Sequence, residues 1–273
     1  MPIIDQPPRQ AWHPAPFIAL SIFAHLGAVA AWLWQPELWA WSLGAISINQ
    51  AVLSLAGLWP RSHLLGPNWT ALPAAAAARG EVAITLDDGP DPAVTPAVLD
   101  LLDRHGAKAT FFCIGERALR QPELCRDILR RGHALGTHSF HHGYGFATLG
   151  LGGFVRELAL AQDALASITG LRPRFFRAPF GLRNPLLDPA LSRLGLSLAS
   201  WTRRGFDTRA SDPALVARRL LRGLKAGDIL LLHDGNAGRT PQGAPVVLDA
   251  LPIVLDALKA AGLRPVTLEE ACR

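Results

Sequence analysis

Two long uncharged stretches near the start of the chain constrain its fold most strongly. Residues 17–34 and 38–59 contain no Asp, Glu, Lys or Arg, and Gln35-Pro36-Glu37 separates them. A helix of about twenty apolar residues crosses the hydrocarbon core of a bilayer. The intervening proline and charge favour a tight turn between antiparallel helices. The sequence therefore predicts two N-terminal transmembrane helices that form a membrane anchor over residues 1–66.

The distribution of tryptophan supports this prediction. Residues 1–80 hold seven of the eight tryptophans but only five charged side chains. Most of these tryptophans lie at the predicted helix ends, where amphipathic rings prefer the headgroup region. A cleaved signal peptide fits less well, because no basic segment of the usual kind precedes the first stretch and a second stretch follows. A helical hairpin buried in a soluble core is the other alternative.

Three polar residues, His25, Asn49 and Gln50, lie inside the two predicted spans. Polar groups at such positions either serve function or stabilise helix–helix contact by hydrogen bonding. We favour helix–helix contact.

The charges that flank the spans predict their orientation. Arg9 precedes the first span and Arg61 follows the second, while the connecting turn carries only Glu37. The positive-inside rule then places both ends in the cytoplasm. The three cysteines lack the spacing of a disulfide framework or a structural zinc site, which agrees with a reducing compartment. The expected location is a bacterial-type inner membrane, with the rest of the chain cytoplasmic.

After an expected linker at residues 67–80, apolar strands alternate with helices. Strands are expected at 82–86, 109–114, 133–137, 175–177, 196–201, 229–232 and 263–266, and helices at 92–105, 116–131, 154–169, 213–224 and 245–261. This alternation predicts an α/β fold with a parallel sheet, either doubly wound or closed as a barrel. In both architectures functional residues gather at the carboxyl ends of the strands.

Two adjacent carboxylates, Asp87 and Asp88, end the first strand of this region. Neighbouring side chains at a strand end point in different directions, so one could bind a metal while the other acts on a water molecule. The alternative is an acidic turn, because Asp-Gly-Pro-Asp is favourable turn chemistry.

Three histidines, His138, His141 and His142, follow the third strand. Residues four apart lie on one side of a helical turn, so His138 and His142 could bind one ion through ring nitrogens. The spacing alone leaves His141 open as the second histidine ligand. A metal site is favoured over a polar loop.

Two further strand ends carry Arg177 and His233. The arginine could orient a carboxylate. A lone histidine at the end of a buried strand is more often structural, but we expect the strand before His233 to lead to the rim that holds the other histidines. That placement favours a catalytic role.

These residues resemble the motifs of the NodB-homology polysaccharide deacetylases, carbohydrate esterase family 4. Thr85–Pro90 resembles T-F-D-D-G-P with leucine for phenylalanine, and His138–His142 matches H-[ST]-x-x-H. Arg177–Gly181 is similar to R-x-P-[YF]-G, and Leu230–His233 resembles L-x-L-H. The resemblance covers about residues 81–270, and four motifs in the family's order make it specific.

The resemblance implies an irregular (β/α) barrel of about seven strands over residues 81–273. It also implies a divalent metal ion, with zinc as the default, held by Asp88, His138 and His142. Asp87 would be the general base and His233 the general acid. Arg177 would hold Asp87, and the backbone N–H of Phe180 would help bind the oxyanion.

One family motif departs from the pattern. Many members carry D-x-x-D-W, whereas this chain has Arg204 and Asp207 at the two aspartate positions and Thr208 in place of tryptophan. The support of His233 is therefore not predicted. Arg203 and Arg204 could bind a phosphate group or be solvated. The residues expected to contact substrate are Pro179, Trp201, Arg204, Asp207 and Leu231.

The expected activity is metal-dependent removal of an N-acyl group, with acetyl favoured, from an amino sugar of a glycan. The membrane anchor and the arginine pair favour a lipid-linked precursor. One alternative is an O-deacetylase of a surface polysaccharide. Another is a non-catalytic glycan-binding membrane protein, which would need neither Asp87 nor His233. The basic residues are not interleaved with aromatics, so no nucleic-acid partner is expected.

Overall fold

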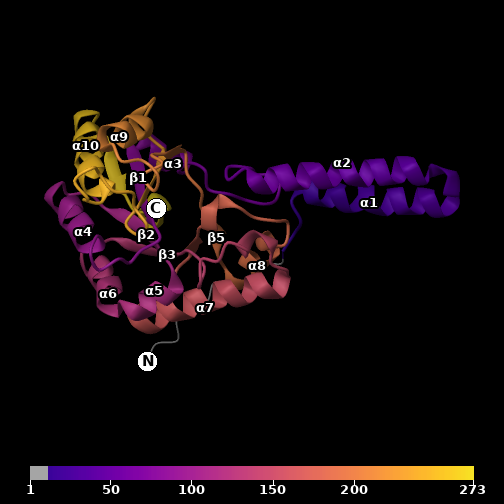
Figure 1. Ribbon diagram of the computed structural model, residues 1–273, viewed down its shortest axis with the longest axis horizontal. Helices are drawn as coiled ribbons and strands as arrows, with labels where there is room; N and C mark the ends of the chain where they lie inside the picture. The colour runs from indigo at the N-terminus through magenta and orange to yellow at the C-terminus, as the bar shows by residue number, and fades with distance from the viewer. Residues whose placement is uncertain (1–11) are drawn as a thin grey trace.

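The computed structural model describes residues 12–273 and consists of a long helical hairpin beside an α/β domain (Figure 1). The hairpin comprises α1 (Pro16–Trp34), a 3₁₀ turn (Pro36–Leu38) and α2 (Trp39–Leu58). At a rise of about 1.5 Å per residue, each helix is roughly as long as a bilayer core is thick.

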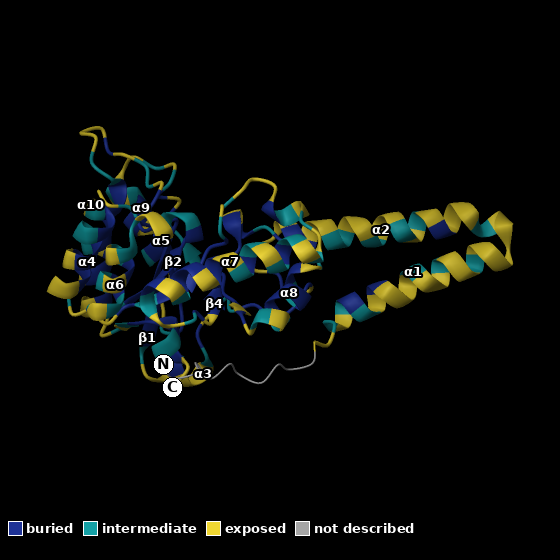
Figure 2. Cartoon of the chain, turned by 90° about the horizontal axis from the view of Figure 1, so that it is seen from below, coloured by how far each residue is buried: buried dark blue, intermediate teal, exposed yellow. Residues whose placement is uncertain are grey.

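Most side chains of the hairpin are exposed (Figure 2). Its helices are long and apolar enough to cross a membrane. Only 11% of the apolar segment of the first helix and 17% of that of the second is buried in the protein. Helices in the core of a soluble protein are mostly buried, so this low burial does not fit the buried-hairpin alternative. Membrane crossing itself stays a prediction.

Polar side chains join the two helices, as the sequence predicts. Ser21 Oγ donates a hydrogen bond to Asn49 Oδ1 at 2.6 Å, and Gln50 Nε2 lies 3.1 Å from His25 Nε2. Because lipid provides no hydrogen-bond partner, such pairs favour helix contact. The helix–helix role expected for His25, Asn49 and Gln50 is confirmed.

The α/β domain is built on a parallel sheet. Its strands are β1 (Glu81–Asp87), β2 (Ala109–Cys113), β3 (Ala134–Thr137), β4 (Phe175–Phe176), β5 (Ser197–Leu198), β6 (Arg203–Arg204), β7 (Ile229–His233) and β8 (Arg264–Val266). Seven of them follow the order β5-β4-β3-β2-β1-β7-β6, and β8 pairs with the first half of β1. The path remains open between β5 and β6 and forms a half-barrel. The predicted parallel α/β fold of about seven strands is confirmed.

Helices surround the sheet. The main ones are α4 (Thr95–Arg104), α5 (Gly115–Arg120), α6 (Pro122–Arg130), α7 (Leu151–Thr169), α8 (Leu187–Leu194), α9 (Pro213–Leu221) and α10 (Val246–Ala260), with short α3 (Ala74–Ala78) and α11 (Leu268–Ala271). The single helix expected over 116–131 is two helices, because Pro122 cannot donate a backbone hydrogen bond and disfavours a helical residue before it.

The alternation of side chains along β1 determines which face of the sheet carries Asp87. Ile84 and Leu86 pack in the cluster beneath α4 and α10, whereas Ala83 packs in the opposite cluster with Ile229 and Leu231. Alternate side chains of a strand point to the same face, so Asp87 lies on the same face as Ala83, at the end of the strand. His233 is level with Asp87 in the register of β1 and β7. The two residues therefore meet at the carboxyl end of the sheet.

The segment that joins the hairpin to the domain packs against the sheet. Trp69 forms a parallel bridge with Ala199 next to β5, and the backbone N–H of Leu72 donates to Gly227 O at 2.8 Å. Leu72 and Ala76 are buried in the same cluster as Ala83. The stretch expected as a linker, 67–80, is therefore fixed along much of its length.

Candidate active site

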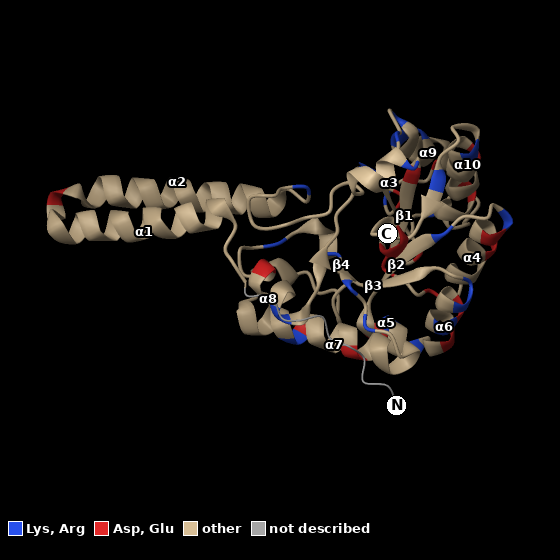
Figure 3. Cartoon of the chain, turned by 180° about the vertical axis from the view of Figure 1, so that it is seen from behind, with Lys and Arg blue, Asp and Glu red and all other residues tan. Residues whose placement is uncertain are grey.

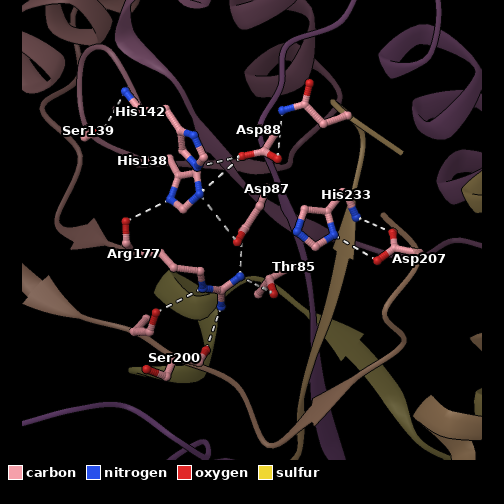
Figure 4. A network of polar contacts seen from close by, with 12 residues as sticks. Thr85, Asp87, Asp88, His138, Ser139, His142, Arg177, Ser200, Asp207 and His233 are labelled. Atoms are coloured by element: carbon pink, nitrogen blue, oxygen red, sulfur yellow. Dashed lines mark hydrogen bonds and ion pairs between the residues drawn. The ribbon is translucent and has the colours of Figure 1, made fainter. Parts of the chain in front are cut away.

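Asp88, His138 and His142 bring three metal-ligand atoms together (Figure 4). Asp88 Oδ1 lies 3.3 Å from His138 Nε2 and 3.2 Å from His142 Nε2. This oxygen is buried and has no hydrogen-bond partner among the described residues. A buried acceptor and two ring nitrogens that face one point fit a cation of the kind that imidazole and carboxylate bind.

The loop that carries the histidines is not helical. Ser139 and His142 have φ angles of 60° and 55°, in the left-handed region, and the backbone N–H of His142 donates to Ser139 Oγ at 3.0 Å. The expectation of a helical turn was therefore wrong. His142 reaches Asp88 because the chain reverses within the loop.

His141 points away from the metal-ligand cluster. Its ring is 57% exposed, and its Nδ1 lies 2.7 Å from Glu157 Oε1. Glu157 also accepts hydrogen bonds from the backbone N–H groups of Phe140 and His141. The structure thus places His142, and not His141, beside His138.

Neighbouring groups orient His138 and Asp88. His138 Nδ1 lies 2.8 Å from the carbonyl oxygen of Arg177, which turns Nε2 toward the cluster. Asn236 donates to Asp88 Oδ2 at 3.0 Å, and Arg117 contacts both Asp88 O and Asn236 Oδ1. Sequence reasoning missed Arg117 and Asn236. Nothing near Arg117 marks it, whereas Asn236 follows His233 closely.

The shifted pKa values of His142 and Asp88 suit metal binding. Burial, helped by the neighbouring His138, lowers the pKa of His142 to about 4. Burial alone would raise the pKa of Asp88, but the close approach and charge of His138, with the charges of His233 and His142, hold that pKa below its usual range. Metal ligands must be a neutral imidazole and an ionised carboxylate.

A buried arginine holds Asp87 on one side of the cluster. Arg177 Nη1 donates to Asp87 Oδ1 at 2.7 Å and to Thr85 Oγ1 at 2.8 Å. Its other nitrogens donate to the carbonyl oxygens of Ala199 and Ser200, which satisfies the buried cation. Asp87 Oδ2 remains 3.8 Å from His138 Nε2, on the side of the cluster.

His233 is level with Asp87 on the neighbouring strand and is held by Asp207. Asp207 Oδ1 is 2.8 Å from His233 Nδ1, and Asp207 Oδ2 accepts the backbone N–H of His233 at 2.7 Å. Asp207 is fully buried, and both its carboxylate oxygens contact His233, so its position is that of a support for His233 and not the accessible one expected of a substrate contact. It supports His233 even though Arg204 and Thr208 depart from the family motif.

The other expected substrate contacts differ in exposure. Leu231 is buried in the cluster with Ile229, so direct contact with substrate is not supported, and Pro179 and Trp201 are also buried. Arg204 is partly exposed, with its guanidinium 5.4 Å from the Trp201 ring. Arg203 is paired with Asp228 and does not serve as a free cation.

Phe180 lies at the exposed side of the histidine loop. Its φ angle is 59°, and its ring is 4.8 Å from His142 and stacked on Tyr144 at 5.5 Å. Phe180 is therefore the expected site residue that combines proximity to the cluster with an accessible side chain.

Comparison with known proteins identifies the family. Residues 75–199 match the model of the polysaccharide deacetylase family. A peptidoglycan-N-acetylglucosamine deacetylase of Bacillus cereus is 34% identical over 199 residues, which cover 70% of this chain and 88% of the relative. This chain belongs to the polysaccharide deacetylase family. The resemblance found in the sequence motifs is confirmed.

Two further polysaccharide deacetylases extend the comparison. A chitooligosaccharide deacetylase of Azorhizobium caulinodans is 35% identical over 191 residues, covering 67% of this chain and 90% of the relative. The crystal structure of a peptidoglycan N-acetylglucosamine deacetylase superposes with a TM-score of 0.68 at 29% identity, covering 75% of this chain and 92% of that chain.

The region matched by the polysaccharide deacetylase model ends before part of the site. It includes Asp87, Asp88, His138, His142 and Arg177, whereas Asp207, His233 and Asn236 follow residue 199. The three later residues reach the site through β7 and the segments beside it. The contacts of these three residues are therefore known from the structure of this chain and not from the match to the family model.

Proposed function

We propose that this chain is a metal-dependent N-deacetylase of glycans that contain N-acetylglucosamine. One observation carries the proposal: Asp87 and His233, which are level in adjacent strands, both lie beside the Asp88–His138–His142 cluster (Figure 4), each with its own buried partner. The names of the similar proteins, which are peptidoglycan and chitooligosaccharide deacetylases, support this class of substrate.

Zinc is the proposed metal. Asp88 Oδ1 and the Nε2 atoms of His138 and His142 would hold it, and three protein ligands are typical of catalytic zinc sites. When bound, the ion would polarise the acyl carbonyl and lower the pKa of a water molecule.

The protein groups then manage the protons. We assign Asp87 as the general base, since Arg177 holds its Oδ1 and leaves Oδ2 on the side of the cluster. We assign His233 as the general acid, since a departing amine must be protonated and Asp207 stabilises the charged ring. The backbone N–H of Phe180 is assigned to the oxyanion.

O-deacetylation of a surface polysaccharide is the alternative reaction for the same residues. An ester releases an alcohol, which depends less on a general acid than an amine does. The elaborate support of His233 by Asp207 therefore favours the amide. A protein that only binds glycans needs neither a general base nor a general acid. The Arg177–Asp87 and Asp207–His233 pairs therefore disfavour a purely glycan-binding role.

The test is metal analysis combined with product release. The purified full-length protein is assayed for bound zinc and for acetate and formate released from chito-oligosaccharides, lipid-linked N-acetylated amino sugars and O-acetylated xylan. We expect bound zinc, and acetate from the N-acetylated substrates. Release from O-acetylated xylan alone would favour the ester reaction, and release from none would reject an enzymatic function.

We propose that the hairpin anchors the protein in the membrane with the deacetylase domain on the outer face. Peptidoglycan lies outside the cytoplasmic membrane, and the similar enzymes named for it support this side. The cytoplasmic orientation was predicted from two flanking arginines, Arg9 and Arg61. Arg9 lies outside the described residues, and the guanidinium of Arg61 donates to Thr202 O of the domain. For the side of the membrane on which the domain lies, the location of the substrate is a stronger indication than the charges of two arginines.

Labelling of Cys272 tests this orientation. Cys272 is exposed, whereas Cys113 and Cys125 are buried. A membrane-impermeant maleimide should label the protein in intact spheroplasts, and Cys272→Ser should abolish the signal. Labelling that requires lysis would place the domain in the cytoplasm.

A further inference from the structure

The end of α2 is fitted closely to the domain near the active site. The backbone N–H of Arg183 donates to Gly57 O at 3.1 Å. A Cβ atom at Gly57 would lie 2.2 Å from Arg183 O, which is closer than nonbonded atoms approach. Only glycine fits this contact, so the helix is seated against the domain.

Pro60, just after α2, connects to the residues that hold Asp87. Ser200 Oγ donates to Pro60 O at 2.6 Å. The carbonyl oxygen of the same Ser200 accepts from Arg177 Nη2 at 2.7 Å, and Arg177 Nη1 holds Asp87. A short series of hydrogen bonds therefore runs from the end of α2 to the proposed general base.

Pro60 also contacts the loop that carries Phe180. Gly181 has a φ angle of 73°, and a Cβ atom there would lie 2.7 Å from Pro60 Cβ and 2.6 Å from Trp201 Cη2. The segment after α2 thus touches the structures on both sides of the site, the support of Asp87 and the Phe180 loop.

The start of α1 and the segment after α2 are tied down as well. Trp12 Nε1 donates to Asp188 in α8 at 2.8 Å, and Arg183 Nη2 donates to Ser62 O at 2.5 Å. Because both ends of the hairpin are bonded to the domain, its direction relative to the active site is fixed. Figure 3 shows the hairpin almost free of charged residues up to its far turn, while the charges lie on the domain.

Exposed apolar side chains lie on the segments that meet at the base of the hairpin. They are Leu58, Trp59, Leu64, Phe180 and Leu186. Exposed tryptophan and leucine next to a membrane span are typical of the bilayer interface. A bilayer that holds the hairpin would end close to the segments that carry Phe180 and Leu186.

We propose that this active site takes its amino sugar from a glycan carried on a membrane lipid, an inference that rests on the proposed deacetylase function. A flexible linker is enough to keep an enzyme near a membrane while it samples a free polymer. Here the hairpin is instead bonded to the walls of the site, which fixes the site beside the interface. That placement suits a sugar held at a constant height by its own lipid anchor.

A flexible insertion tests the proposal in the full-length protein in lipid nanodiscs. Twelve Gly/Ser residues inserted between Leu58 and Trp59, combined with Gly57→Ala and Trp12→Phe to remove the contacts with Arg183 and Asp188, free the hairpin while leaving Pro60 with the domain. The two probes are polyprenyl-diphosphate-linked N-acetylglucosamine in the same nanodisc and free chitotetraose. The inserted protein should deacetylate the free sugar within about twofold of the wild type and the lipid-linked sugar at least tenfold more slowly.

Matched glycine substitutions in α2 provide the second measurement. Gly57→Ala should displace the helix from Arg183 and lower the ratio of lipid-linked to free-sugar turnover. Gly44→Ala is the control, since a Cβ atom at Gly44 would have no neighbour within 4 Å. Unchanged ratios in both the inserted and the Gly57→Ala proteins would overturn the proposal. If wild-type protein with bound metal released acetate from neither probe, the deacetylase function would fail instead.

Discussion

Asp207 places both carboxylate oxygens on His233. Oδ1 lies 2.8 Å from the ring Nδ1, and Oδ2 accepts the backbone N–H at 2.7 Å. Asp207 is fully buried, so this pairing is insulated from solvent. The contact fixes the ring with Nε2 available to the site and favours its protonated form.

The pH profile should report this pair. Burial lowers the pKa of His233, but the charge and hydrogen bond of Asp207, together with the charges of Asp87 and Asp88, raise that pKa above its ordinary value. A general acid must carry its proton, so activity should be present below this pKa and be lost as the pH rises through it. Asp207→Asn should move the loss of kcat/KM to lower pH by roughly one to two pH units.

Asp212→Asn is the control for charge removal, because Asp212 caps α9 at an exposed position. It should leave the profile in place. An identical alkaline limb in the wild type and Asp207→Asn would show that His233 is not the group that titrates.

Substitution of Asp87 should separate catalysis from metal binding. Asp87 is held by Arg177 and lies beside the Asp88–His138–His142 cluster. Asp87→Asn should lower turnover by about 10²- to 10⁴-fold, the usual value of a general base, while the purified protein keeps its metal. Asp88→Asn should lose metal and activity together. Metal loss from Asp87→Asn would instead make Asp87 a ligand.

The strands that carry the site were predictable because they are short apolar runs covered on both faces. β1, β2 and β7 all begin and end within one residue of their expected bounds. β6 was missed because two arginines do not resemble a strand, and α8 because it is short and contains Pro189. Both elements form through tertiary contacts.

The limits of prediction within the site have a similar cause. Asp87, Asp88 and His138 were predictable because each lies within a short contiguous motif whose residue types already indicate the chemistry. The support from Asp207 and Asn236 depends on how distant segments close over the strand ends. The left-handed backbone at Ser139 and His142 likewise has no signal in the histidine spacing.

The two adjacent histidines offer a matched comparison. His142 Nε2 lies 3.2 Å from Asp88 Oδ1, whereas the exposed His141 is paired with Glu157. His142→Ala should bind zinc far more weakly and lose activity, and His141→Ala should retain both within a few-fold. Metal titration and acetate release measure the two effects. A reversed result would assign the metal to His141.

Asn236 should act through Asp88 without taking part in the chemistry. Its amide donates to Asp88 Oδ2 at 3.0 Å, while Arg117 holds the Asn236 carbonyl oxygen at 2.9 Å. Loss of a group that orients a metal ligand typically costs 10- to 100-fold in metal affinity. Asn236→Ala should therefore bind zinc about that much more weakly, with most of the turnover restored at saturating zinc. His141→Ala serves again as the control. Turnover that stays low when the metal site is full would show that Asn236 acts on the substrate instead.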